Sequence, residues 1–78
     1  MKPKKALKML SALAQDTRLS IFRLLIQEGP DGLSAGMISE ILQVPAATLS
    51  FHLSQLTEAG LIDPTRDGRT IMYSAKYK

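Results

Sequence analysis

The sequence predicts a small, mainly α-helical domain that ends in a β-hairpin, and three observations lead to that fold class. Apolar residues recur at spacings of three and four along most of the chain, which is the period of one helix face. Glycines and prolines fall at isolated points and divide the chain into short segments. Near the end, Asp67-Gly68 lies between two β-prone runs. With 78 residues in total, we expect a single domain over 1–78.

The composition argues against several classes of function. The chain has no cysteine, so it has no disulfide, thiolate metal site or cysteine nucleophile, and its one histidine, His52, cannot form a histidine metal site alone. A domain of this size buries only ~60% of its unfolded surface, so a deep catalytic pocket would leave little core. No apolar run approaches the ~20 residues that cross a bilayer, and no signal-peptide pattern follows the basic start. We expect a soluble cytoplasmic protein that is not an enzyme and has no metal, cofactor or membrane partner.

Two helices are expected in the first part of the chain. Leu7 and Leu10 lie on one apolar face of a helix over about 4–14. Asp16 is of a residue type that accepts hydrogen bonds from free amides at a helix start, so we expect it to cap a second helix over about 17–28. A Gly-Pro pair ends that helix. Its expected apolar stripe consists of Leu19, Phe22, Leu25 and Ile26.

Two further helices follow, separated by a tight break. Ser34 can cap a short helix over about 34–42. The pattern breaks at Gln43-Val44, and Pro45 suits the first position of the next helix because its missing N–H has no partner there. We expect this fourth helix over about 45–59, ending at a glycine. Its apolar side is a seam of leucines at spacings of four and three: Leu49, Leu53 and Leu56.

A β-hairpin is expected over about 61–75. An Asp-Gly pair between β-prone runs favours a two-residue turn in which both residues have positive φ. In that register Arg66 faces Arg69 at the tip, and Ile62 faces Tyr73 near the base. The proline of the first strand has no N–H to donate, so that strand should lie at an edge or carry a bulge.

A short capped helix, a tight turn, a longer helix and a basic-tipped hairpin form, in this order, the layout of a winged helix-turn-helix. Four stretches of the sequence resemble the arsenic-repressor (ArsR-type) family of bacterial winged-helix transcriptional repressors. They are LAQDTRL at 13–19, TLSFHL at 48–53, LTEAGLI at 56–62, and RDGR at 66–69 leading into Tyr73-Ser74. The resemblance covers nearly the whole chain in order and spacing, and it implies a protein that binds double-stranded DNA.

The fourth helix is the expected reader of DNA. At about 100° per residue its leucines cluster on one side and leave the opposite side open. The major groove admits one α-helix, and short side chains near the N-terminal end of that helix can approach base edges. By resemblance, the base-contacting positions of the family fall on Ala46, Ala47, Thr48, Ser50 and Phe51, with Gln55 one turn further.

Two residues of this helix have competing interpretations. Phe51 is of a type usually found in a core, but its direction opposite to the leucines favours an exposed contact. His52 lies about 60° from the centre of the leucine seam. We include it among the DNA-binding candidates, bonded either to the scaffold or to a phosphate, because no second histidine or cysteine could join it on a metal. A hydrolytic triad with Ser50 is rejected because residues two apart on a helix do not face each other.

Positive charge is concentrated at the two ends of the chain. Residues 1–8 hold four lysines and no acid, and residues 64–78 hold four cations and one acid. The fourth helix has no Lys or Arg, although phosphate neutralisation supplies most non-specific affinity for DNA. The charge must therefore come from Arg18, Arg66 and Arg69 and from the terminal lysines. The wing arginines suit the flanking minor groove or its phosphates; the alternatives are solvated turn charge and, for the lysines, a solvated tail.

Two features of the family are absent from the sequence. Many members begin the third helix with a cysteine pair that senses metals, where this chain has Ser34 and Gly36. The family usually continues past Lys78 into a last helix that packs with the first to form the dimer, so this sequence is either a truncated piece or a short variant. We still expect a homodimer through the face of Leu7 and Leu10, because below ~80 residues a lone core rarely supplies more than ~3–5 kcal/mol. Without the last helix that dimer should be weak.

The leading hypothesis is a sequence-specific transcriptional repressor that acts as a homodimer. A two-fold dimer places two reading helices on successive major-groove faces, about 34 Å apart, and so predicts a pseudo-palindromic operator. The alternative is a winged-helix module for protein–protein interaction, in which the uncharged fourth helix and an exposed Phe51 dock on a partner.

Overall fold

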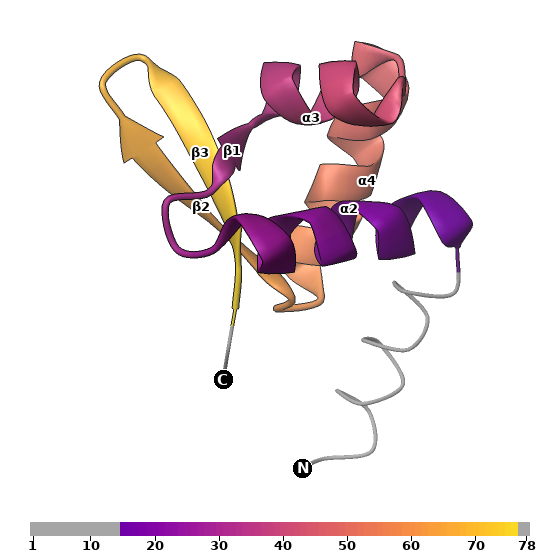
Figure 1. Ribbon diagram of the computed structural model, residues 1–78, viewed down its shortest axis with the longest axis horizontal. Coiled ribbons are helices and arrows are strands. Elements are labelled where there is room, and N and C mark those ends of the chain that lie inside the picture. The colour runs from indigo at the N-terminus through magenta and orange to yellow at the C-terminus, as the bar shows by residue number, and fades with distance from the viewer. Residues whose placement is uncertain (1–14, 77–78) are drawn as a thin grey trace, which may run out of the picture.

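The structure, a computed structural model, describes residues 15–76. The expected helix over 4–14, with Leu7 and Leu10, lies outside the described residues. Figure 1 shows the described elements in chain order. They are α2 (Asp16–Glu28), β1 (Leu33–Ser34), α3 (Ala35–Leu42), α4 (Ala46–Glu58), β2 (Ile62–Asp67) and β3 (Thr70–Ala75). The expected fold class, mainly α with a small hairpin, is confirmed. None of the helices in this part of the chain is long and apolar enough to cross a membrane.

Helix α2 begins one residue before the expected range. Its N-cap residue is Gln15, whose side chain makes no cap hydrogen bond, and Asp16 lies in the first turn. The prediction that Asp16 caps this helix is therefore wrong. The carboxylate of Asp16 still lies where the positive end of the helix dipole favours a negative charge.

The buried face of α2 differs from the expected stripe. Ile21 and Leu25 are fully buried, whereas Ile26, expected in the stripe, is 43% exposed. Leu19 and Phe22 are half-buried. The helix turns its 21/25 side toward α4 and the sheet, so the face is rotated from the one that the sequence pattern favours.

The start of α3 and the α3–α4 turn follow the expected chemistry closely. The Ser34 hydroxyl accepts a hydrogen bond from the Met37 amide at 3.2 Å, which confirms the predicted cap. At the far end Gln43 adopts left-handed backbone angles, with φ 57°. Pro45 is the N-cap of α4, with φ −57° and ψ 143°, so it precedes the helix instead of opening it as expected. The two helices are thus joined by a tight turn.

The sheet has three antiparallel strands in the order β1-β3-β2. Strand β1, in which Leu33 pairs with Tyr73, lies between α2 and α3, where the sequence pattern predicts no strand. A strand of two residues is too short to show a period in the sequence. Gly32 precedes it with φ +72°, and a Cβ there would lie 2.4 Å from the Tyr73 carbonyl oxygen, so glycine is needed for this close approach. Strand β2 is an edge strand, as its proline requires.

The hairpin is present, but its register is shifted from the predicted one. Arg66 does not face Arg69, and Ile62 does not face Tyr73. The turn residues are Gly68 and Arg69, and of these two Gly68 alone has positive φ, at 65°. This sign pattern suits a two-residue hairpin turn with glycine first, instead of the predicted turn with two positive φ values. The observed pairs are Ile62↔Ala75, Asp63↔Ser74, Pro64↔Tyr73, Thr65↔Met72, Arg66↔Ile71 and Asp67↔Thr70.

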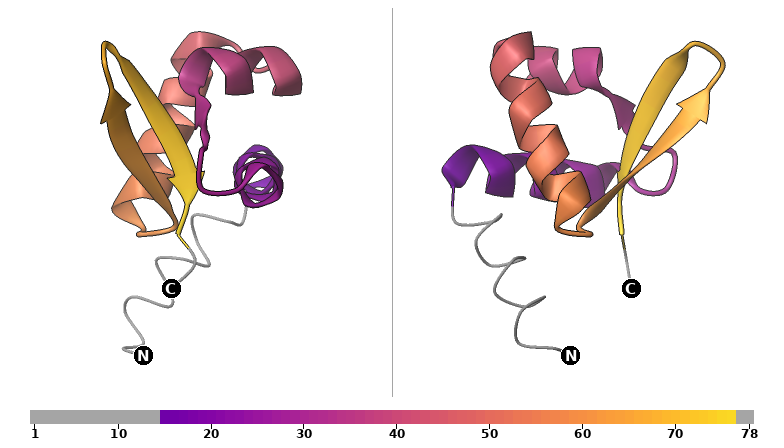
Figure 2. Two further views of the ribbon diagram at one scale, coloured as in Figure 1. Left: turned by 60° about the vertical axis from the view of Figure 1, so that its left-hand side comes forward. Right: turned by 180° about the vertical axis from the view of Figure 1, so that it is seen from behind.

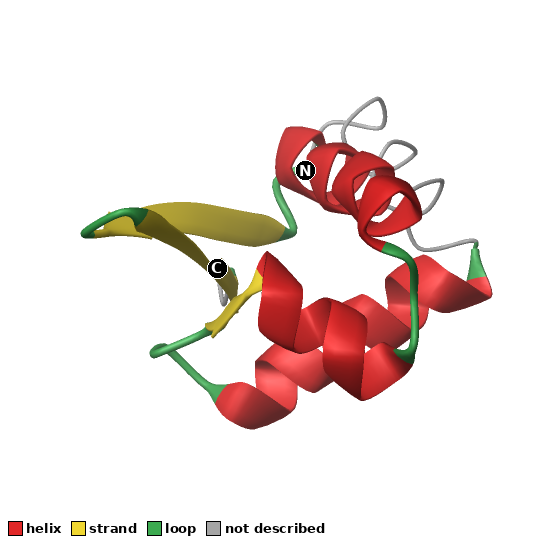
Figure 3. Ribbon diagram, turned by 90° about the horizontal axis from the view of Figure 1, so that it is seen from above, coloured by secondary structure: helices red, strands yellow, loops and turns green. Residues whose placement is uncertain are grey.

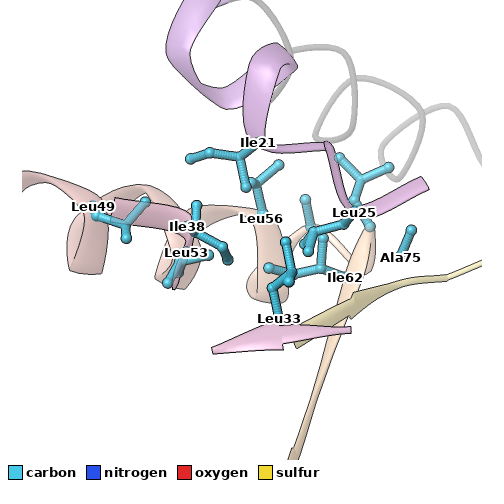
Figure 4. Close-up of a cluster of buried hydrophobic side chains, with 11 residues drawn as sticks. Ile21, Leu25, Leu33, Ile38, Leu49, Leu53, Leu56, Ile62 and Ala75 are labelled. Atoms are coloured by element: carbon cyan, nitrogen blue, oxygen red, sulfur yellow. The ribbon is translucent and has the colours of Figure 1, made fainter. Parts of the chain in front are cut away.

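The core lies between the three described helices and the base of the sheet (Figure 4). The α4 leucines Leu49, Leu53 and Leu56 all point into it and are at most 2% exposed, as their spacing predicts. Burying one such side chain contributes about 1.5–3 kcal/mol. The other core residues are Ile21, Leu25, Leu33, Ile38, Ala59, Leu61, Ile62 and Ala75. The core fixes α4 on one side and leaves its other side free.

Candidate nucleic-acid interface

Helix α4 has one side in the core and one side in solvent. The leucine seam anchors it, so the residues of its first half that point the other way are accessible. We call this exposed surface the reading face; it consists of Ala46, Ala47, Thr48, Ser50 and Phe51. Gln55, the sixth expected contact, is half-buried one turn further along. These side chains are short, polar or apolar, and none is charged.

The hairpin lies along one flank of α4. Viewed from behind, α4 passes between the first turns of α2 on one side and the hairpin on the other (Figure 2, right). From above, the hairpin projects away from the helices (Figure 3). A groove runs between α4 and the hairpin, and its walls include Ser50 and Ser54 from the helix and Pro64, Ile71 and Tyr73 from the strands. A wing and a reading helix thus share one surface.

Both wing arginines are exposed, and neither of them lines this groove. Arg66 pairs with Ile71, and strand alternation puts it on the sheet face of Pro64 and Ile71, which is the face toward α4. On its edge strand Arg66 also borders the hollow on the opposite face, beside Asp31. Arg69 lies in the turn and borders a hollow with the start of α3. Of the two, Arg69 is the better-placed cation for a ligand that covers α3 and α4.

His52 lies inside the fold instead of on the reading face. It is 5% exposed, and its Nδ1 accepts a hydrogen bond of 3.1 Å from Nε of Arg18. Burial, and then the charge of Arg18, lower the pKa of His52. A ring that accepts at Nδ1 is neutral, with its proton on Nε2. Of the two expected partners of His52, the structure favours the scaffold, because Arg18 donates to its Nδ1. Its place among the DNA-binding candidates stays a prediction.

Phe51 has the exposed orientation that its helix position predicts. It is 57% exposed. The guanidinium carbon of Arg18 lies 5.6 Å from the centre of its ring, within the range of a cation–π interaction. The rings of Phe51 and His52 are 6.0 Å apart and tilted by 57°. The sequence pointed to the charge of Arg18 but not to this cluster. Arg18, Ile21 and Leu25 share one side of α2 at spacings of three and four, and that pattern indicates a face toward α4.

The positions of the family's metal-sensing cysteines have another role in this chain. The Ser34 hydroxyl is used as the α3 cap, and Gly36 follows in the first turn. Within residues 15–76, no group of three or more His, Asp or Glu side chains is placed to hold a metal ion.

Comparison with known proteins agrees with this geometry. A model of a helix-turn-helix domain matches residues 13–65. The transcriptional activator HlyU of Vibrio cholerae is 33% identical over 70 residues, which are 90% of this chain and 62% of that protein. A solved structure of HlyU superposes with a TM-score of 0.85 at 30% identity, covering 100% of this chain and 84% of that one.

Two further solved structures share the fold. An ArsR-like transcriptional regulator from Rhodococcus sp. RHA1 has a TM-score of 0.83 at 29% identity, covering 94% of this chain and 66% of that one. A homodimeric winged helix-turn-helix DNA-binding domain from Mycobacterium bovis has a TM-score of 0.83 at 26% identity, covering 92% and 64%. The chain spans between 49% and 67% of the length of the sequence relatives it matches. It belongs to the ArsR-type family of winged helix-turn-helix transcriptional regulators.

Proposed function

We propose that this chain binds double-stranded DNA in a sequence-specific manner and represses transcription as a homodimer on a pseudo-palindromic operator. The observation that carries the proposal is the exposed, uncharged side of α4 beside an arginine-bearing hairpin. In a helix-turn-helix the N-terminal residues of the second helix contact base edges, and those residues of α4 are the accessible ones. The protein acts in the cytoplasm, and no catalysis or cofactor is required.

The reading face supplies side chains suited to base edges. The hydroxyls of Thr48 and Ser50 can donate to or accept from several bases, and Ala46 and Ala47 can contact a thymine methyl group. Gln55 has the amide that pairs with adenine in the major groove. The exposed ring of Phe51 adds apolar contact. Together these groups discriminate sequence while adding no net charge.

The wing supplies the electrostatic part of binding. Arg69 in the turn, with Arg66 on the edge strand, can contact the phosphates or the minor groove next to the one that α4 enters. Such contacts strengthen binding to every sequence alike. The wing therefore sets affinity, and α4 sets specificity.

A homodimer is supported by the related domain from Mycobacterium bovis, which is homodimeric. Repression follows where the operator overlaps a promoter. HlyU carries the name of an activator, so the direction of regulation depends on where the operator lies. A reporter gene downstream of an operator that the protein binds should be expressed less when the protein is present. Higher expression would show that the protein activates transcription from that promoter.

Titration against duplex DNA at several salt concentrations tests the proposal. We expect affinity to fall steeply as salt rises, and Arg69→Ala to weaken binding to all sequences and reduce the salt slope by about one. Arg23→Ala removes an exposed arginine of α2 and serves as the matched control. Salt-insensitive or undetectable DNA binding by a folded protein would favour the alternative, a module in which the reading face docks on another protein.

A further inference from the structure

We propose that Arg18 is a phosphate-binding residue of the DNA interface, and that His52 and Phe51 hold its guanidinium in position for that contact. The inference rests on the proposed DNA-binding function and extends it by a third cation and two positioning residues. The cluster of Arg18, Phe51 and His52 is not part of the hydrophobic core and does not include the hairpin.

Two directional contacts fix the Arg18 side chain. Its Nε donates a hydrogen bond to Nδ1 of the buried His52, 3.1 Å away. Its guanidinium carbon lies 5.6 Å from the centre of the Phe51 ring. The first contact comes from the buried side of α4 and the second from its exposed side. Together they place the guanidinium at the border between the core and the reading face.

These contacts leave the outer part of the guanidinium available. An arginine has five N–H donors, and the contact with His52 uses the one on Nε. Asp16 and Glu58, on the same two helices, are exposed, and within residues 15–76 no carboxylate forms an ion pair with Arg18. A half-buried cation with free donors therefore lacks an anion from the described part of the fold. The terminal nitrogens of arginine match the oxygens of a phosphate.

The position of Arg18 indicates which anion would meet it. The right-hand view of Figure 2 shows α4 between the first turns of α2 and the hairpin. Arg18 lies in those first turns, and Arg69 lies in the hairpin turn. When α4 enters a major groove about 12 Å wide, the phosphates of both groove edges lie beside it. Arg69 is placed for one edge, and Arg18 for the other.

His52 and Phe51 hold the Arg18 side chain in one conformation before DNA binds. A free arginine side chain loses rotamer entropy when it is fixed in one conformation. Here the hydrogen bond to His52 and the Phe51 ring fix much of it before any ligand arrives. His52 touches no ligand in this arrangement, so it is a positioning residue. Phe51 both supports Arg18 and remains exposed for the duplex.

The salt dependence of binding to a random-sequence duplex tests the role of Arg18. We expect Arg18→Ala to weaken binding roughly tenfold and to reduce the salt slope by about one, as for one lost phosphate contact. Arg23→Ala is the matched control on the same helix, and its slope should equal that of the wild type. If Arg69→Ala flattens the slope and Arg18→Ala leaves it unchanged, the inference is wrong and the proposed function stands. If the wild type shows no salt-dependent binding, the proposed function itself fails.

Variants of His52 test the positioning role. Asparagine keeps an acceptor close to the place of Nδ1, whereas leucine does not. We expect His52→Asn to keep the wild-type salt slope and His52→Leu to lower it as Arg18→Ala does. A purely structural role would lower the Tm of both variants and change neither slope.

A measurement on the wild-type protein tests the role of Arg18 even if the variants do not fold. The Nε–H resonance of Arg18 can be followed by NMR while a random-sequence duplex is added. A large shift at saturation is expected, because a phosphate would approach the same guanidinium. A resonance that stays unchanged at saturation would overturn the inference.

Discussion

Two neighbouring residues of α4 show how position decides the role of a side chain. Phe51, the larger and more apolar, is 57% exposed, whereas His52 is 5% exposed. One helical step of about 100° separates them. The burial of His52 is tolerated because its Nδ1 has a hydrogen-bond donor in Arg18. An apolar residue in solvent beside a hydrogen-bonded polar residue in the core is the reverse of the usual distribution, in which apolar residues are buried and polar residues are exposed.

The buried histidine gives the stability of the fold a pH dependence. Burial and the charge of Arg18 lower the pKa of His52, so the unfolded chain binds a proton more readily than the folded one. The stabilisation is complete above the ordinary pKa of 6.5 and is lost as the pH falls from there through the lower folded value. Urea unfolding between pH 5 and 8 should show the loss in the wild type. His52→Asn should flatten it, and equal losses in both proteins would contradict this origin.

Discrimination between base pairs should depend on Ser50 more than on Ser54, which lies one helical turn further along α4. If the Ser50 hydroxyl bonds one base, Ser50→Ala should remove about 1–3 kcal/mol of preference at that position and leave the salt slope unchanged. Ser54→Ala makes the same chemical change on the exposed side one turn further and is the control. Binding to a selected operator and to its single-base variants measures both. Equal loss of preference in the two variants would contradict the assignment of Ser50.

At the scale of elements, the helices were the predictable part of the fold because the apolar spacing and the Ser34 cap act locally. The hairpin register was not predictable from the Asp-Gly pair. The turn uses Gly68 and Arg69, and the register also has to suit the pairing of β3 with β1. Strand β1 itself depends on the close approach of the Gly32 backbone to the Tyr73 carbonyl oxygen, and no periodic pattern in the sequence predicts this contact. Non-local contacts decided these features, as they did the rotated face of α2.

In the candidate site, too, the features that depend on local sequence could be predicted, and those that depend on contacts between distant residues could not. The exposed side of α4 follows from its leucine spacing, so the accessibility of Ser50 and Phe51 could be expected. The partnership of Arg18 with His52 joins residues 34 positions apart, and only the packing of α2 against α4 brings them together. A lone histidine therefore looked equally suited to a phosphate and to the scaffold.

Gly32 offers a test of the β1–β3 contact. Alanine at this position would suffer both a positive φ, at +72°, and a Cβ 2.4 Å from the Tyr73 carbonyl oxygen. Gly60 has a similar φ of +80°, but a Cβ added there would have no atom within 4 Å, so Gly60→Ala isolates the backbone strain, about 1–2 kcal/mol. Chemical denaturation should show Gly32→Ala to be clearly more destabilised than Gly60→Ala. Equal losses would show that the strand shifts freely.

At the scale of the whole molecule, the arginines and the proposed base contacts lie on separate parts of one surface. The reading face has no charged residue, and the described arginines near it lie on its flanks, in α2 and in the hairpin. A single copy presents one helix to one major groove, which reads only a few base pairs. The proposed specificity for one operator among many sites would therefore require a second copy, and the affinity would then depend on the spacing of the two half-sites.

Half-site spacing provides the test at this scale. A two-fold dimer places its reading helices one helical turn apart, so two half-sites about 10 base pairs apart, centre to centre, should bind it most tightly. Inserting about five base pairs turns one half-site to the opposite side of the duplex, because that is half a helical turn, and the dimer can then engage one half-site only. Gel-shift titration should show affinity falling to that of a duplex with a single half-site, whereas a one-base change outside both half-sites should have little effect. If the five-base-pair insertion leaves the affinity unchanged, the two copies bind independently, and a preformed dimer does not set the operator's symmetry.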